Sequence, residues 1–144
     1  MKKILIILIL VFVGIQFIPM NVPADVPDKE GDALAAPADV QAILKRSCFD
    51  CHSNHTTFPW YSSIAPVSWF TKNHVKEGRK HMNFSTWNSY TDEKKLKYLD
   101  KIPKAIKSKM PLASYLIMHQ DAKLSDADKK AITDWATNAA FDLE

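Results

Sequence analysis

Glycine is scarce in this sequence, and cysteine is scarcer. The 144 residues include three glycines and two cysteines, against eight prolines. Folds rich in β-strands need many tight turns, and such turns draw on glycine. No convincing stretch alternates apolar and polar residues with a period of two, and no internal repeat is visible. The composition therefore favours helices joined by proline-containing loops, and the length suits one domain.

The longest apolar run lies at the start of the chain. Lys2 and Lys3 precede an uncharged run from Ile4 to Ile18, a pattern typical of a secretory signal. Counted to Met20, the run reaches about 17 residues, the lower limit for spanning a bilayer. No good A-x-A cleavage site follows. We therefore expect residues 1–20 to be a retained signal anchor, with a cleaved signal peptide as the alternative, and either form exports the rest of the chain.

One domain is expected after this segment. Residues 21–37 are polar and contain proline, which predicts a flexible tether. Residues 38–144 are expected to form an all-α bundle of about four helices. Apolar residues recur at helical spacing in Val40, Ile43 and Leu44, in Leu96, Leu99, Ile102 and Ile106, and in Ile132, Trp135, Ala136 and Ala139. The helices are predicted over residues 39–46, 67–81, 92–108 and 125–141, and Trp69, Phe70, His74 and Gly78 fall along one side of the second.

Local signals set the ends of two of these helices. Thr91 is expected to cap the third helix, and Ser125-x-x-Asp128 resembles a capping box at the start of the fourth. Pro103 lies inside the third helix and is expected to kink or divide it. The first helix leads directly into Cys48.

The segment "TTFPWYSSIAPVSW", residues 56–69, is a long aromatic loop fixed by prolines. It has too little polarity for a solvated linker. We expect it to wrap something apolar and flat.

The two cysteines stand in the motif C-x-x-C-H, as Cys48, Cys51 and His52. A structural zinc site needs four ligands, and the other histidines show no paired spacing. Thioredoxin-like chemistry needs a βαβ unit, which is not visible, and a plain disulfide does not require His52. The motif therefore predicts covalent haem c, with two thioether bonds from the thiols and His52 as the proximal iron ligand.

The sixth iron ligand is less constrained by the sequence. Met110 follows the third predicted helix in "SKMPLASY", and Pro111 fixes the backbone beside its sulfur. We expect Met110 to bind the iron, with His74 and His119 as rivals and an open position as a further alternative. His55 is expected at the surface and His81 at a helix end.

Three runs carry a resemblance to a known family: "CFDCHSNHTTFPWYSSIAPVSWFTKNHVKEGR", "NFSTW" and "MPLASYLIMHQDAKLSDADKKAITDWA". They resemble the small bacterial haem-binding domain family, mono-haem relatives of the class I cytochromes c. The resemblance implies a cytochrome c-like fold, haem ligation through Cys48, Cys51 and His52, and support for Met110. His74 and His119 lie inside the matching runs and remain rivals.

Charge is unevenly distributed along the chain. Residues 72–109 contain eleven basic and four acidic residues, and residues 110–144 contain three basic and six acidic ones. The basic band is either a solvated helical face or a docking surface for an acidic redox partner, and such surfaces mainly raise encounter rates. Nucleic acid is not an expected partner of an exported haem protein.

These observations predict an exported mono-haem c-type cytochrome that carries single electrons and is not an enzyme. It is expected on the periplasmic side of the bacterial inner membrane, anchored by its N-terminal segment, or else soluble in the periplasm. A haem-based enzyme or a gas or redox sensor with an open sixth position is the alternative. A domain that the haem merely stabilises is a third possibility.

Overall fold

The computed structural model describes residues 1–23, 25 and 27–143, and within these ranges it contains helices and no strands. The α-helices are α1 (Lys2–Ile15), α2 (Ala38–Ser47), α3 (Phe49–His52), α4 (Val67–His81), α5 (Asp92–Ser108), α6 (Ala113–Leu116) and α7 (Asp126–Phe141). Three short 3₁₀ helices, η1 (Trp60–Ser63), η2 (Phe84–Ser89) and η3 (Gln120–Ala122), lie between them. The all-α prediction is confirmed.

The four predicted helices correspond to α2, α4, α5 and α7. Thr91 accepts a hydrogen bond from the backbone of Lys94, and Ser125 and Asp128 form the expected capping box. Pro103 does not divide α5, which continues to Ser108. Sequence periodicity did not reveal α3 and α6, because a helix of four residues is too short to show it.

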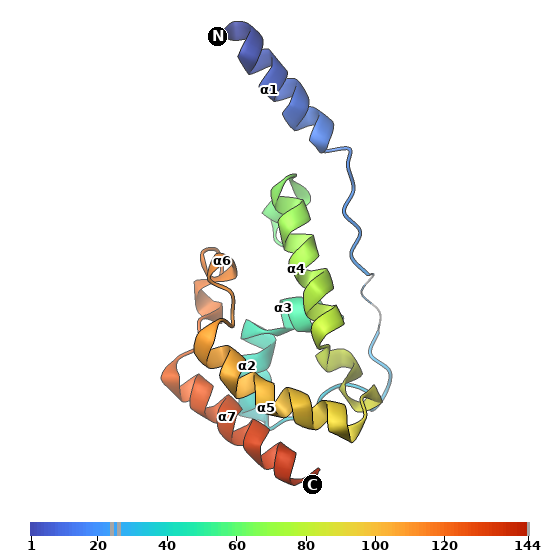
Figure 1. Cartoon of the computed structure of the whole chain (residues 1–144), viewed down its shortest axis with the longest axis vertical. Coiled ribbons are helices and arrows are strands. Elements are labelled where there is room, and N and C mark those ends of the chain that lie inside the picture. Colours follow the sequence, from blue (N-terminus) through green and yellow to red (C-terminus); the bar gives the residue numbers. More distant parts are fainter. Residues whose placement is uncertain (24, 26, 144) are drawn as a thin grey trace.

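The core lies where α2, α5 and α7 meet. Figure 1 shows α5 and α7 side by side, with α2 next to them and α4 rising from this base. The core includes Leu44 and Ile132, which are 1% and 0% exposed, and Leu99 from α5. Phe84 and Trp87 of η2 join the same cluster. This packing fixes the end of α2, and therefore the position of the cysteine motif that follows it.

The buried face of α4 differs from the side that the sequence suggested. Ser68, Val75 and Arg79 are its buried residues, whereas Phe70 is 54% exposed. Of the residues proposed for one side of this helix, Gly78 is the one that packs closely against another element. Polar Ser68 and Arg79 occupy the inner face, so hydrophobicity alone could not locate it.

The N-terminal helix α1 projects from the rest of the molecule (Figure 1), and none of its residues is buried. Across the described ranges, no helix is long and apolar enough to cross a membrane. Residues expected to form the tether make specific contacts with the domain. Arg79 donates hydrogen bonds to the carbonyl of Pro23 and to the carboxylate of Asp25, and Leu34 is 5% exposed in the core.

Candidate haem site

One turn of chain holds both cysteines and His52. The helix α2 ends at Ser47, and the backbone N–H of Cys48 still bonds to the carbonyl of Leu44 at 2.8 Å. The backbone N–H groups of Cys51 and His52 both donate to the carbonyl of Cys48, at 3.2 and 3.0 Å. These bonds close the short helix α3, so the three side chains of the motif are carried on one rigid turn.

The imidazole of His52 is oriented by a backbone group. Its Nδ1 lies 3.0 Å from the carbonyl oxygen of Met82, the residue that caps the end of α4. A carbonyl oxygen can only accept, so Nδ1 carries the proton and Nε2 keeps its lone pair. Burial lowers the pKa of His52, although the hydrogen bond to Met82 opposes this. The ring is therefore neutral near pH 7 and has one nitrogen free to bind a metal.

Cys48 and Cys51 are free, half-buried thiols. Burial, reinforced by charge repulsion from Cys51, raises the pKa of Cys48 to about 12. Burial and the nearby Asp50 carboxylate raise the pKa of Cys51 to about 11. Catalytic and redox cysteines have lowered pKa values, so these thiols lack the property that thioredoxin-like chemistry requires.

Close packing between α4 and α3 depends on Gly78. A Cβ atom added at this position would overlap the carbonyl oxygen of Cys51 and would lie 3.1 Å from the Cys51 Cβ. Only glycine lets the two helices approach this closely. The same approach brings the end of α4, with its Met82 carbonyl, to His52.

The segment that carries Met110 is tied to the motif by a hydrogen bond. Met110 lies half-buried between α5 and α6, and its backbone N–H donates to the carbonyl of Ala105 at 2.9 Å. Tyr115 of α6 donates its hydroxyl to Oδ2 of Asp50, inside the motif, at 2.7 Å. Burial and this hydrogen bond raise the pKa of Tyr115, so the phenol stays protonated. The structure thus brings the Met110 segment to the turn that carries His52.

Each rival histidine is hydrogen-bonded through Nδ1 to a backbone carbonyl four residues before it. His74 donates from Nδ1 to the carbonyl of Phe70 at 2.8 Å and packs on the Phe70 ring. His119 stacks on Tyr115 with ring centroids 4.0 Å apart, and its ring nitrogens lie 3.5 Å from the Tyr61 hydroxyl. His55 is exposed and pairs with Asp28 at 3.0 Å. Within the described ranges, no three side chains from His, Cys, Asp and Glu gather closely enough to hold a metal ion.

A comparison with known families covers most of the chain. The family model described as the haem-binding domain matches residues 10–138. The chain belongs to the haem-binding domain family. No curated protein matches the chain, and no solved structure matches it either.

The residues of this haem-binding domain fit the group that the family name implies. A haem iron needs an imidazole with a free nitrogen, and the bond to Met82 leaves Nε2 of His52 free. Thioether attachment needs two unpaired thiols beside that histidine, which Cys48 and Cys51 supply. The Met82 carbonyl and the Tyr115–Asp50 bond are features that sequence analysis missed, whereas Gly78 was named on one side of its helix but without this role. The C-x-x-C-H motif predicted the ligands, but no local pattern predicts these long-range contacts.

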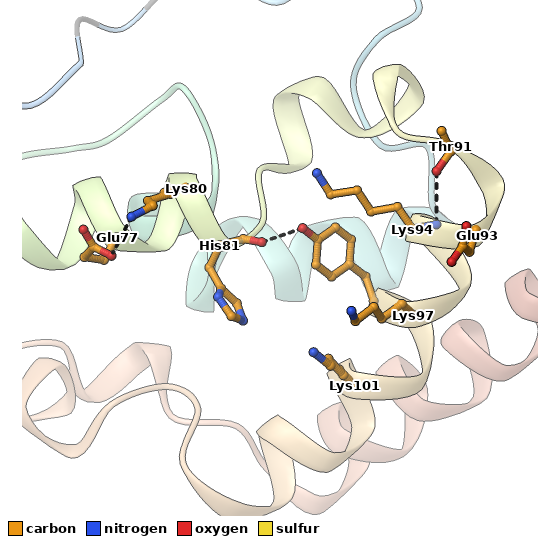
Figure 2. A pocket seen from close by; sticks show the side chains of 9 residues that line it. Glu77, Lys80, His81, Thr91, Glu93, Lys94, Lys97 and Lys101 are labelled. Atoms are coloured by element: carbon orange, nitrogen blue, oxygen red, sulfur yellow. Dashed lines mark hydrogen bonds and ion pairs between the residues drawn. The ribbon is translucent and has the colours of Figure 1, made fainter.

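A basic cavity of about 570 Å³ opens in the haem-binding domain between the end of α4 and the first half of α5. Figure 2 shows His81, Lys97 and Lys101 turned toward the same space. Lys94 lies 4.2 Å above the Tyr90 ring, and Lys80 has Glu77 at 4.0 Å. Lys97 and Lys101 make no ion pair with any residue that the structure describes. The cavity therefore presents unpaired positive charge to solvent.

Proposed function

We propose that this chain is an exported mono-haem c-type cytochrome that carries single electrons between redox partners. The observation that supports it most strongly is the hydrogen bond from His52 Nδ1 to Met82, next to two free thiols on the same turn. In this proposal Cys48 and Cys51 hold the haem covalently, and His52 and Met110 bind its iron. When bound, the haem supplies an iron that accepts and releases one electron.

The protein side chains would hold the redox site rigid. His52 cannot rotate without losing its bond to Met82, so its Nε2 keeps one direction in both redox states. The bond between Tyr115 and Asp50 would keep the Met110 segment beside the motif. A rigid site favours electron transfer, because little structure must rearrange when the charge changes.

The main alternative is a haem enzyme or a gas or redox sensor, which needs an open or displaceable iron position. Optical and EPR spectra of the purified protein in both redox states separate the two. Six-coordinate spectra in both states and no reaction with carbon monoxide would support electron transfer. Ready carbon monoxide binding and turnover of peroxide would overturn it in favour of the alternative.

The proposal places the domain on the periplasmic side of the bacterial inner membrane, held there by α1. Apolar residues fill this helix after Lys2 and Lys3, and none of them is buried against the domain. The basic cavity between α4 and α5 is proposed to receive an acidic surface of a redox partner. Such a surface raises the rate of encounter more than the strength of binding.

A further inference from the structure

Residues 4–24, 51–71, 81–91 and 110–120 contain no Lys, Arg, Asp or Glu. Residues 51–71 and 110–120 belong to the folded domain, and they carry nearly all its exposed large apolar side chains. These are Phe58, Trp60, Ile64, Val67, Phe70, Ile117 and Met118, which we call the apolar end. Trp60 is 74% exposed and Ile117 70%. Exposed apolar patches on folded domains mark protein or membrane interaction sites or ligand-binding grooves.

The two domain stretches are neighbours in space. The Tyr61 hydroxyl lies 3.5 Å from the ring nitrogens of His119, and the two rings meet edge to face. This contact places the segment after α6 beside η1. The exposed side chains of both stretches therefore form one end of the molecule.

The apolar helix α1 ends at the same place. The Gln16 side chain makes two hydrogen bonds with the backbone of Ala65, accepting from its N–H at 2.9 Å and donating to its carbonyl at 3.1 Å. The indole of Trp69 donates to the carbonyl of Ile18 at 3.0 Å. In Figure 1 the end of α1, the start of α4 and α6 lie toward one end, opposite α5 and α7. The apolar end therefore lies next to the C-terminal end of α1, the helix that we propose to lie in the membrane.

The orientation of α4 shows that Phe70 points away from the core. Phe70 follows Ser68 by two residues, so it lies about 200° around the helix from the buried Ser68, at 100° per residue. Gly78, by contrast, faces the motif at Cys51. Phe70, which follows the aromatic segment of residues 56–69, is thus directed outward by α4. Tryptophan and other aromatic side chains are favoured at the boundary between lipid and water.

We propose that the apolar end lies against the surface of the lipid bilayer, with α1 in the membrane. The segment that carries Met110 would then lie near the lipid, and the basic cavity between α4 and α5 would remain in the aqueous phase. This inference rests on the proposed retention of α1, but it does not depend on haem attachment. The apolar end is proposed to contact lipid, and not a second copy of the chain.

The test is photo-crosslinking to lipid in vesicles that contain the full chain. A phosphatidylcholine with a diazirine near the glycerol end of one acyl chain is irradiated, and tryptic peptides are examined by mass spectrometry. Adducts are expected in peptides 4–29, 47–72 and 110–123. They should remain at background in peptide 131–144, whose Phe141 is 69% exposed at the other end of the domain.

Variants make the test specific. The pair Trp60→Ser and Ile117→Ser should lower the yield of adducts several-fold in peptides 47–72 and 110–123, and leave peptide 4–29 unchanged. Phe141→Ser is the matched control, and it should change nothing.

Adducts confined to peptide 4–29 would overturn this inference and leave the proposed anchoring intact. A chain without adducts in any peptide would overturn both this inference and the proposed anchoring. Equal yields in peptide 131–144, or crosslinks between copies through peptides 47–72 in place of lipid adducts, would also contradict it.

Discussion

His52 Nδ1 lies 3.0 Å from the backbone carbonyl of Met82, and this distance joins the cysteine motif to the end of α4. The carbonyl is available because α4 ends at His81 and Met82 turns to extended backbone. The helix can come this close because Gly78, one turn earlier, has no side chain to meet Cys51. The end of α4 at Met82 thus sets the orientation of the His52 ring.

Gly78→Ala should destabilise the protein. Alanine favours the helix by about 1 kcal/mol over glycine, but overpacking costs about 1–3 kcal/mol. The added Cβ would meet backbone atoms of Cys51, which cannot move aside as a flexible side chain can. We therefore expect an overpacking cost in the upper part of this range, about 2–3 kcal/mol, and a net loss of about 1–2 kcal/mol in urea unfolding. Gly14→Ala is the control, because nothing lies within 4 Å of its added Cβ. A stabilised Gly78→Ala variant would contradict the close approach.

Covalent haem attachment should depend on both thiols. Wild-type protein on a denaturing gel should give a band that stains for haem peroxidase activity, since thioether bonds survive unfolding. Replacing Cys48 and Cys51 with alanine should remove the band, because these are the two cysteines of the chain. His55→Ala, at an exposed histidine near the motif, should keep it. Complete loss of haem from wild type in acid acetone would refute covalent attachment.

Met110→Ala should change the optical spectrum of the oxidised protein. If the Met110 sulfur binds the iron, the weak far-red charge-transfer band should disappear, and Met110→His should lower the reduction potential. Met118→Ala is the matched control, since Met118 is 58% exposed and lies eight residues further along the chain. An unchanged spectrum in Met110→Ala would transfer the ligand assignment to His74 or His119.

Tyr115→Phe should loosen the Met110 segment. The variant removes the bond to Asp50, and a half-buried hydrogen bond to a charged group is worth about 1–2 kcal/mol. The raised pKa of Tyr115 also predicts a pH dependence. Above about pH 10 the unfolded phenol releases its proton while the native one keeps it, so wild type loses stability with rising pH. Tyr115→Phe lacks this loss. The gap between wild type and Tyr115→Phe in the free energy of unfolding should therefore close above pH 10.

Urea titrations from pH 7 to 11 measure the gap between wild type and Tyr115→Phe. Tyr61→Phe is the comparison: burial also raises the pKa of Tyr61, but its hydroxyl makes only 3.5 Å contacts with His119, so its stability difference from wild type at pH 7 should be small. A gap that stays constant to pH 11 would show that Tyr115 is not held by Asp50 in solution.

The sequence was sufficient for the long helices because their ends carry chemical signals. Thr91 and Ser125 cap α5 and α7, and Pro66 precedes α4, so the predicted bounds lie within one residue of the observed ones. The cysteine motif is equally local. The supports around it are not, because Tyr115 and Asp50 are 65 residues apart and Met82 contributes a backbone atom. Such contacts arise from packing and leave no pattern in the chain.

The basic cavity provides the last prediction. Lys97 and Lys101 stand four residues apart on α5, and both line the cavity. Glu93 stands four residues before Lys97 and lines the same cavity, but neither lysine makes an ion pair with a residue that the structure describes. Electron transfer to an acidic partner should slow as the salt concentration rises, because the electrostatic screening length falls to about 10 Å at 0.1 M salt.

Lys97→Glu with Lys101→Glu should slow that reaction at low salt and flatten its salt dependence without shifting the haem spectrum. Lys129→Glu with Lys130→Glu changes the net charge equally on α7, where both lysines already have acidic partners. Stopped-flow rates for the two variants at matched ionic strength therefore separate local docking from net charge. Equal rates in both would mean that Lys97 and Lys101 belong to a solvated face, whereas slowing only in the first would place the partner at the cavity.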